Sequence, residues 1–307
     1  MLIETNKLSL GILFPIEAYE GAIPKMDRDT QIRLAQKAEE NGFHTLWVRD
    51  VPLHDPNFRD VGQIFDPWIY MAHIASLTKT IKIGAASMVL PLRHPIHFAK
   101  AAASLDVLFP DRLHLGVASG DRALEYPAFA KPYETRSTDF IRQMENIREF
   151  WRTDFPHYES AFGMLNGEAN IIPKPNRGNI PMYITGHAGG INLDWIAING
   201  DGWIYYPREF SYTKNIIQNW KDILDRLHQP RKPYIQPLYI DLLEDPNAEP
   251  IALDLGFRLG RNYFIDLLQT LQYMGVNHGI FIAKFCSRPL DDVIEEIGKE
   301  VIPHIND

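Results

Sequence analysis

Residues 81–120, IKIGAASMVLPLRHPIHFAKAAASLDVLFPDRLHLGVASG, decide the fold. An apolar strand at 81–86 ends in small residues, a proline-bounded loop leads into an alanine-rich helix, and a second apolar strand at 113–118 ends in Ser119-Gly120. This order predicts a βαβ unit with two parallel strands. Because enzymes built on parallel strands bind ligands at the carboxyl ends of the strands, we expect a site there.

The rest of the chain repeats the alternation of strand and helix. Eight strands are expected, at 8–14, 45–48, 81–86, 113–118, 182–185, 203–205, 235–240 and 279–283. Eight such units in 307 residues predict a single α/β domain over 1–307, a (β/α)8 TIM barrel, with an inserted hairpin or loop at about 153–180 before strand five. A doubly wound open sheet is the alternative, but no G-x-G-x-x-G follows the first strand.

Composition excludes several classes of protein. Apolar residues make up 45% of the chain, which allows a large core and excludes a disordered chain. The net charge of −8 argues against nucleic acid or an anionic membrane as a partner. No run of 18 apolar residues occurs, no secretory signal is evident, and Cys286 is the single cysteine. These features together predict a cytoplasmic protein.

Four groups of residues are candidates for binding a ligand. Ala86 and Ser87 leave room at the end of the third strand, and Ser119 and Arg122 follow the fourth with a hydroxyl and a positive charge. The turn Gly186-His187-Ala188-Gly189-Gly190 can direct backbone N–H groups at a phosphate. Trp203 and Tyr205 in the next strand, or Tyr206 after it, can wall one face of an aromatic ring system.

Two other kinds of site find no support in the sequence. The 11 histidines include no H-x-x-x-H or H-E-x-x-H pattern, and there is no cysteine cluster, so no metal site is expected. A G-x-S-x-G motif is also absent, which argues against an esterase.

Several motifs together resemble the bacterial luciferase-like monooxygenase superfamily. They are AEENGFHTLWV at 38–48, TIKIG at 80–84, VLPLRHP at 89–95, DRLHLGV at 111–117, ITG at 184–186 and GDGW at 200–203. The resemblance spans nearly the whole chain and is most specific at 84–120. It implies a barrel that holds FMN at its carboxyl face, a cis peptide bond at Ala86-Ser87, and a phosphate loop formed by 186–190.

Two departures from the luciferase pattern limit what the resemblance implies. Ser119 stands where the luciferase subunit has a phosphate-binding arginine, so the positive partner must lie elsewhere, at Arg122 or His187. Val51 stands at the position of a catalytic histidine, so we expect no light emission. His54, in the same loop, is one candidate to replace this histidine. Asp50 is the other candidate, because the family often carries an acid there and we expect only one of Arg49 and Asp50 to face the interior.

Three hypotheses remain open at this stage. The first is an FMN-dependent oxidoreductase or monooxygenase in which reduced flavin and O₂ act on a small organic substrate, with a flavin reductase or NAD(P)H as the source of electrons. The second is an F420-dependent dehydrogenase, and the third is a flavin-binding protein without turnover. The resemblance also implies a homodimer that pairs through exposed helices.

Overall fold

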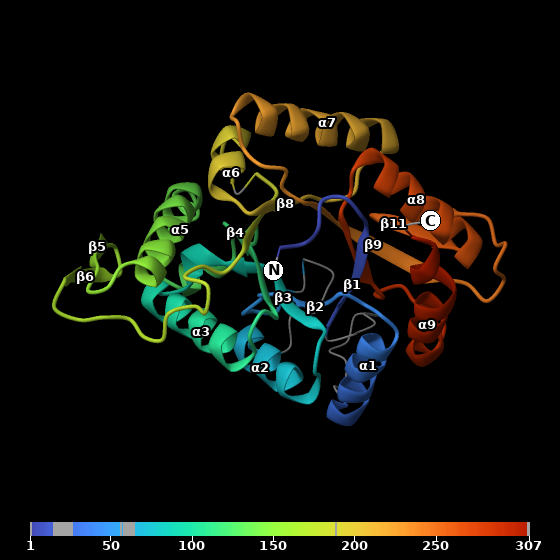
Figure 1. Ribbon diagram of the computed structural model, residues 1–307, viewed down its shortest axis with the longest axis horizontal. Helices are drawn as coiled ribbons and strands as arrows, with labels where there is room; N and C mark the ends of the chain where they lie inside the picture. Colours follow the sequence, from blue (N-terminus) through green and yellow to red (C-terminus); the bar gives the residue numbers. More distant parts are fainter. Residues whose placement is uncertain (1, 15–26, 56, 58–64, 188, 306–307) are drawn as a thin grey trace.

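Eight parallel strands form a closed barrel in the computed structural model, which describes residues 2–14, 27–55, 57, 65–187 and 189–305 (Figure 1). The strands run in the order β1(Ser9–Leu13), β2(Thr45–Val48), β3(Lys82–Val89), β4(Leu113–Ala118), β7(Met182–Thr185), β8(Gly202–Ile204), β9(Tyr234–Leu242) and β12(His278–Ile282). The barrel closes through β8 and β9, where Ile204 lies opposite Ile235, and through β12 and β1. The predicted (β/α)8 barrel is therefore confirmed.

Helices surround the barrel in the order of the chain (Figure 1). They are α1(Arg28–Glu40), α2(Pro67–Leu77), α3(Pro95–Leu108), α5(Arg136–Arg152), α6(Leu193–Asn199), α7(Phe210–Arg226), α8(Arg261–Met274) and α9(Leu290–Glu296), with the short α4(Glu125–Ala128) above β4 and the single turns η2(Leu90–Leu92), η3(Ile297–Val301) and η4(Ile302–His304). Local chemistry sets where they begin. The Asp66 carboxylate caps α2 by accepting from the N–H groups of Trp68 and Ile69, and Pro67 occupies the first position.

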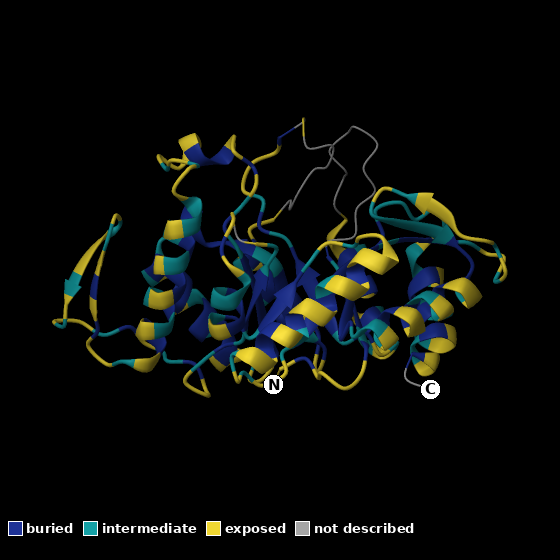
Figure 2. Cartoon of the chain, turned by 90° about the horizontal axis from the view of Figure 1, so that it is seen from above, coloured by how far each residue is buried: buried dark blue, intermediate teal, exposed yellow. Residues whose placement is uncertain are grey.

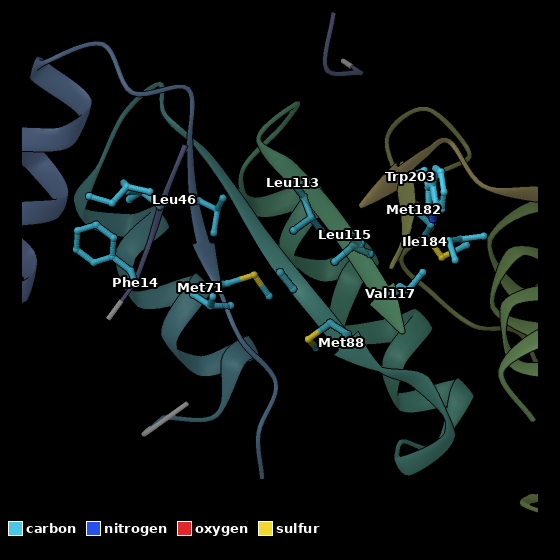
Figure 3. Close-up of a cluster of buried hydrophobic side chains, with 14 of the residues drawn as sticks. Phe14, Leu46, Met71, Met88, Leu113, Leu115, Val117, Met182, Ile184 and Trp203 are labelled. Atoms are coloured by element: carbon cyan, nitrogen blue, oxygen red, sulfur yellow. The ribbon is translucent and has the colours of Figure 1, made fainter. Parts of the chain in front are cut away.

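The main hydrophobic core fills the layer between strands and helices. Figure 3 shows part of it, with Leu115 and Val117 of β4 near Met88 of β3. The barrel strands are largely buried, whereas the helices expose their outer face (Figure 2). No helix in the described ranges combines the length and the apolar composition that a membrane crossing requires.

Two antiparallel hairpins interrupt the alternation. The first, β5(His157–Ser160) with β6(Gly163–Asn166), lies in the segment where an insertion was predicted. The second, β10(Ile251–Leu253) with β11(Gly256–Leu259), was not predicted. β11 continues the main sheet by pairing in parallel with the far end of β9, so the turn of this hairpin lies at the carboxyl side of the barrel.

Candidate active site

A cavity of about 470 Å³ opens at the carboxyl ends of the barrel strands. Leu13 at the end of β1, Ala86 and Ser87 in β3, and Ser119 after β4 form part of its wall. Thr185 at the end of β7, Ile204 in β8 and Ile280 in β12 also line it. The cavity thus lies where the sequence predicted a binding site, because parallel strands deliver all their carboxyl ends to one face.

The peptide bond between Ala86 and Ser87 is cis, as the resemblance implied. Both residues line the cavity, and the hydroxyls of Ser87 and Thr185 hydrogen-bond each other at its wall. Gly84, two residues earlier, has a different role: a β-carbon there would lie 2.7 Å from the Trp47 ring. The small residues of this strand therefore leave space for two different things. Gly84 makes room for the buried indole of Trp47, and Ala86 and Ser87 make room for the cavity.

Three polar groups converge on Gly189 in the loop after β7. A β-carbon placed on Gly189 would lie 2.5 Å from Ser137 Oγ, 3.2 Å from Arg136 Nε and 3.2 Å from Ser119 Oγ. Gly189 has a φ of +79°, a conformation that favours glycine. Arg136 and Ser137 are the first two residues of α5, so the positive end of a helix dipole also faces this point. We call this group of Ser119, Arg136, Ser137 and Gly189 the anion cradle.

Other residues of the predicted phosphate loop take different positions. Gly186 and His187 line the cavity, whereas Gly190 is not among the described lining residues. The N–H of Gly190 donates to the carbonyl of His187 at 2.8 Å, which forms the turn into α6. Ala188 lies outside the described residues.

Trp203 is not among the described residues that line the cavity. It is 1% exposed and belongs to the main core with Met182 and Ile184 (Figure 3). Its neighbour Ile204 lines the cavity, and because side chains alternate along a strand, Trp203 must point outward. Its indole N–H donates to the carbonyl of Gly186 at 2.7 Å and so supports the loop from behind.

Asp50 lies at the cavity wall, but its carboxylate is engaged. It forms a bidentate ion pair with Arg93 at 2.6 and 2.7 Å and accepts from the N–H of Val89 at 2.9 Å. It thus joins the loop after β2 to the end of β3. Arg49 also lines the cavity, contrary to the expectation that only one of the two would. Both residues follow the end of β2 at Val48, where strand alternation no longer applies.

The loop after β2 supplies no histidine to the cavity within the described residues. His54 is exposed and absent from the described lining. Val51 does line the cavity, but its side chain cannot carry a proton.

Arg136 and Glu125 are among the residues of the site that sequence reasoning missed. Arg136 stacks its guanidinium 3.9 Å from the centroid of Tyr133, which also lines the cavity. Glu125 lines the cavity and is 2% exposed. Burial raises its pKa to about 7, and Arg122, another buried residue of the wall, partly opposes this rise. Neither residue stands in a motif, so only the three-dimensional fold identifies them.

Comparison with known proteins agrees with the fold. The chain matches the model of the luciferase-like monooxygenase family over residues 8–235 and belongs to that family. It is therefore an enzyme of an oxidoreductase family.

The relatives include one uncharacterised protein and two enzymes that use different cofactors. An uncharacterised protein of Mycobacterium tuberculosis is 29% identical over 195 residues, 59% of this chain and 68% of that one. The oxygenase component of a flavin-dependent trigonelline monooxygenase from Acinetobacter baylyi is 30% identical, over 50% of this chain and 40% of that one. An F420-dependent glucose-6-phosphate dehydrogenase from Amycolatopsis mediterranei is also 30% identical, over 56% and 52%.

A solved structure shows the same fold. The monooxygenase RslO1 from Streptomyces bottropensis superposes with a TM-score of 0.81, covering 96% of this chain and 99% of that one at 14% identity. The barrel fold is therefore a known architecture.

Proposed function

We propose that the protein is an FMN-dependent oxidoreductase that uses reduced flavin and O₂ on a small organic substrate. The observation that carries this proposal is the anion cradle at one side of the barrel cavity. Ser119 and Arg136 approach a single point beside Gly189, where a phosphate can accept hydrogen bonds and meet a positive charge. The Ser137 hydroxyl donates to the Gly189 carbonyl at 2.7 Å and so holds the loop beside the first turn of α5.

The residues present fit a flavin mononucleotide. Arg136 supplies the cation that Ser119 cannot, from the first turn of α5. Ala86 and Ser87 line the cavity with small side chains, which leaves space for a planar ring. When bound, FMN supplies the two-electron redox chemistry, while the protein orients it and limits access of water. The electrons come from a flavin reductase or from NAD(P)H.

Replacing Arg136 tests the cradle directly. Arg136→Ala removes a charge-assisted hydrogen bond to the phosphate, so the affinity for FMN should fall by about tenfold to a hundredfold. The measurement is calorimetric titration of the purified protein with FMN. Arg142→Ala, on an exposed position of the same helix, is the matched control and should bind as the wild type does.

Two further titrations define what the result means. Riboflavin lacks the phosphate, so Arg136→Ala should bind it as the wild type does. Equal losses for riboflavin and FMN would show that the phosphate does not contact Arg136.

The second candidate function, an F420-dependent dehydrogenase, is favoured by the identity with F420-dependent relatives. Tighter binding of F420 than of FMN would decide for it.

A further inference from the structure

Glu125 is a buried acid at the wall of the cavity with half of its carboxyl unpaired. It is the first residue of α4, in the segment that joins β4 to α5. The carboxyl accepts a hydrogen bond from the backbone N–H of Leu53, whereas Oε1 has no partner in the described part of the chain. Burying a polar atom without a partner costs free energy, and natural proteins retain few such atoms.

The groups around Glu125 shift the pKa of its carboxyl in opposite directions. Burial raises its pKa to about 7, the guanidinium of Arg122 lowers it, and the carboxylates of Asp50 and Asp121 raise it. Asp50 is itself paired with Arg93, which reduces its effect. An acid with a pKa near neutrality is suited to donate and accept protons in catalysis.

We propose that Glu125 is a catalytic acid of this cavity and donates a proton to the oxygen that is reduced there. This inference rests on the proposed flavin function. Without a second substrate, two electrons and one proton pass from the reduced FMN anion to O₂, and one further proton completes H₂O₂. The Glu125 O–H bond breaks to supply that proton, and solvent then protonates the carboxylate again. In the described loop after β2, Val51 and the exposed His54 offer no acid to the cavity.

The first test measures the ionisation of Glu125 in the protein without flavin. The pKa is higher in the folded state than the model value of 4.5, so the folded state binds more protons between these values. Wild-type stability should therefore lose this contribution as the pH rises toward 8. Urea unfolding should show Glu125→Gln gaining stability relative to the wild type between pH 5 and pH 8. The control Glu134→Gln, at an exposed position of the same segment, should follow the wild type. A constant difference between Glu125→Gln and the wild type would overturn the proposal.

The second test follows the proton transfer. FMN-loaded protein is reduced with dithionite and mixed with oxygenated buffer, and flavin absorbance reports reoxidation from pH 6 to pH 9. The wild-type rate should fall as the pH rises through about 7, whereas Glu125→Gln should react about a hundredfold more slowly, without that transition. Glu125→Asp should keep a transition, and Glu134→Gln should follow the wild type.

The outcomes separate the two proposals. A wild-type pH profile in Glu125→Gln overturns the role of Glu125 and leaves the flavin function standing. Failure of the wild-type protein to bind FMN overturns the flavin function, and this inference with it.

Discussion

Glycine has two distinct physical roles in this barrel, and they are visible only residue by residue. Gly84 is needed for space, because a β-carbon would lie 2.7 Å from the Trp47 ring inside the barrel. Gly189 is needed for conformation as well as space, since its φ is +79° and polar groups surround its α-carbon. A change at Gly84 therefore disturbs packing, whereas a change at Gly189 disturbs the proposed phosphate site.

Placing a negative charge at Gly189 should weaken the binding of FMN. Gly189→Asp adds a carboxylate beside the point where the phosphate is proposed to lie, and the two charges repel at short range. Gly189→Ala carries the steric and conformational cost without the charge. FMN titrations of both variants should show a larger loss for the aspartate, and the excess should shrink as salt is added. Equal affinities of the two variants would place the phosphate elsewhere.

At the scale of elements, the hairpin β10–β11 shows why some structure escapes prediction. Its turn is Asp254-Leu255, and Leu255 adopts a φ of +61°. Tight hairpin turns usually place glycine or asparagine at such positions, so the sequence lacks the signal by which hairpins are recognised. The hairpin is held by long-range contacts instead: Arg258 Nε lies 2.6 Å from Asp241 Oδ2, and Oδ1 accepts from the N–H and hydroxyl of Ser287 at 2.9 and 3.0 Å.

Removing the cation of this pair should loosen the hairpin. Asp241 is fully buried, so Arg258→Met leaves its charge with two hydrogen bonds and without the cation that the described residues pair with it. Because the Arg258 side chain is 43% exposed, we expect a loss of about 1–3 kcal/mol in the free energy of unfolding, less than for a fully buried pair. Urea denaturation measures it. Asp254 and Leu255 line the cavity, so ligand affinity should change too.

The control for this prediction is an exposed ion pair. Arg28→Met breaks the pair with Asp29, in which both side chains are at least 74% exposed, and should cost less than about 1 kcal/mol. The double variant Arg258→Met/Asp241→Asn should recover part of the stability. If Arg258→Met costs no more than Arg28→Met, the pair does not hold the hairpin.

The sequence predicted elements better than it predicted side-chain partners. The strands at 113–118 and 182–185 match β4 and β7, because apolar runs bounded by turn formers depend on local pattern. The position of the cavity followed from the parallel topology alone. The roles of Arg136 and Glu125 could not be predicted, since both depend on how the segment after β4 folds back over the barrel. The outward position of Trp203, in contrast, could have been predicted from the alternation of faces along β8.

At the scale of the whole molecule, the interior of the barrel has two parts. A layer of polar side chains lies at the amino ends of the strands, and the cavity lies at their carboxyl ends. His44, His114 and His278 lie at the amino ends of the strands, with the His44 ring 5.9 Å from that of His114 and 5.4 Å from that of His278. The indole N–H of Trp47 donates to His278 Nε2 at 2.9 Å, and an indole can only donate. His278 must therefore be neutral at Nε2, and its Nδ1 can donate to Ser9 Oγ at 2.7 Å. The barrel interior depends on uncharged histidines.

This dependence predicts a loss of stability in mild acid. Burial lowers the pKa of His44 to about 4 and holds those of His114 and His278 well below the ordinary value of 6.5. Above pH 6.5 these histidines are neutral in both states. As the pH falls from 6.5 toward 4, the unfolded chain binds protons that the folded barrel does not. Each histidine should thus cost up to about 1.4 kcal/mol per pH unit in the free energy of unfolding.

Urea unfolding between pH 5 and pH 7.5 measures this slope, and a matched pair of variants assigns it. His278→Gln keeps an acceptor for the indole but cannot titrate, so its stability should fall less steeply in acid than that of the wild type. His157→Gln, on the exposed strand β5, should leave the slope unchanged. Since a protonated His278 cannot accept from Trp47, retained stability at pH 5 would mean that the interior admits a charge through rearrangement, contrary to this account of the barrel.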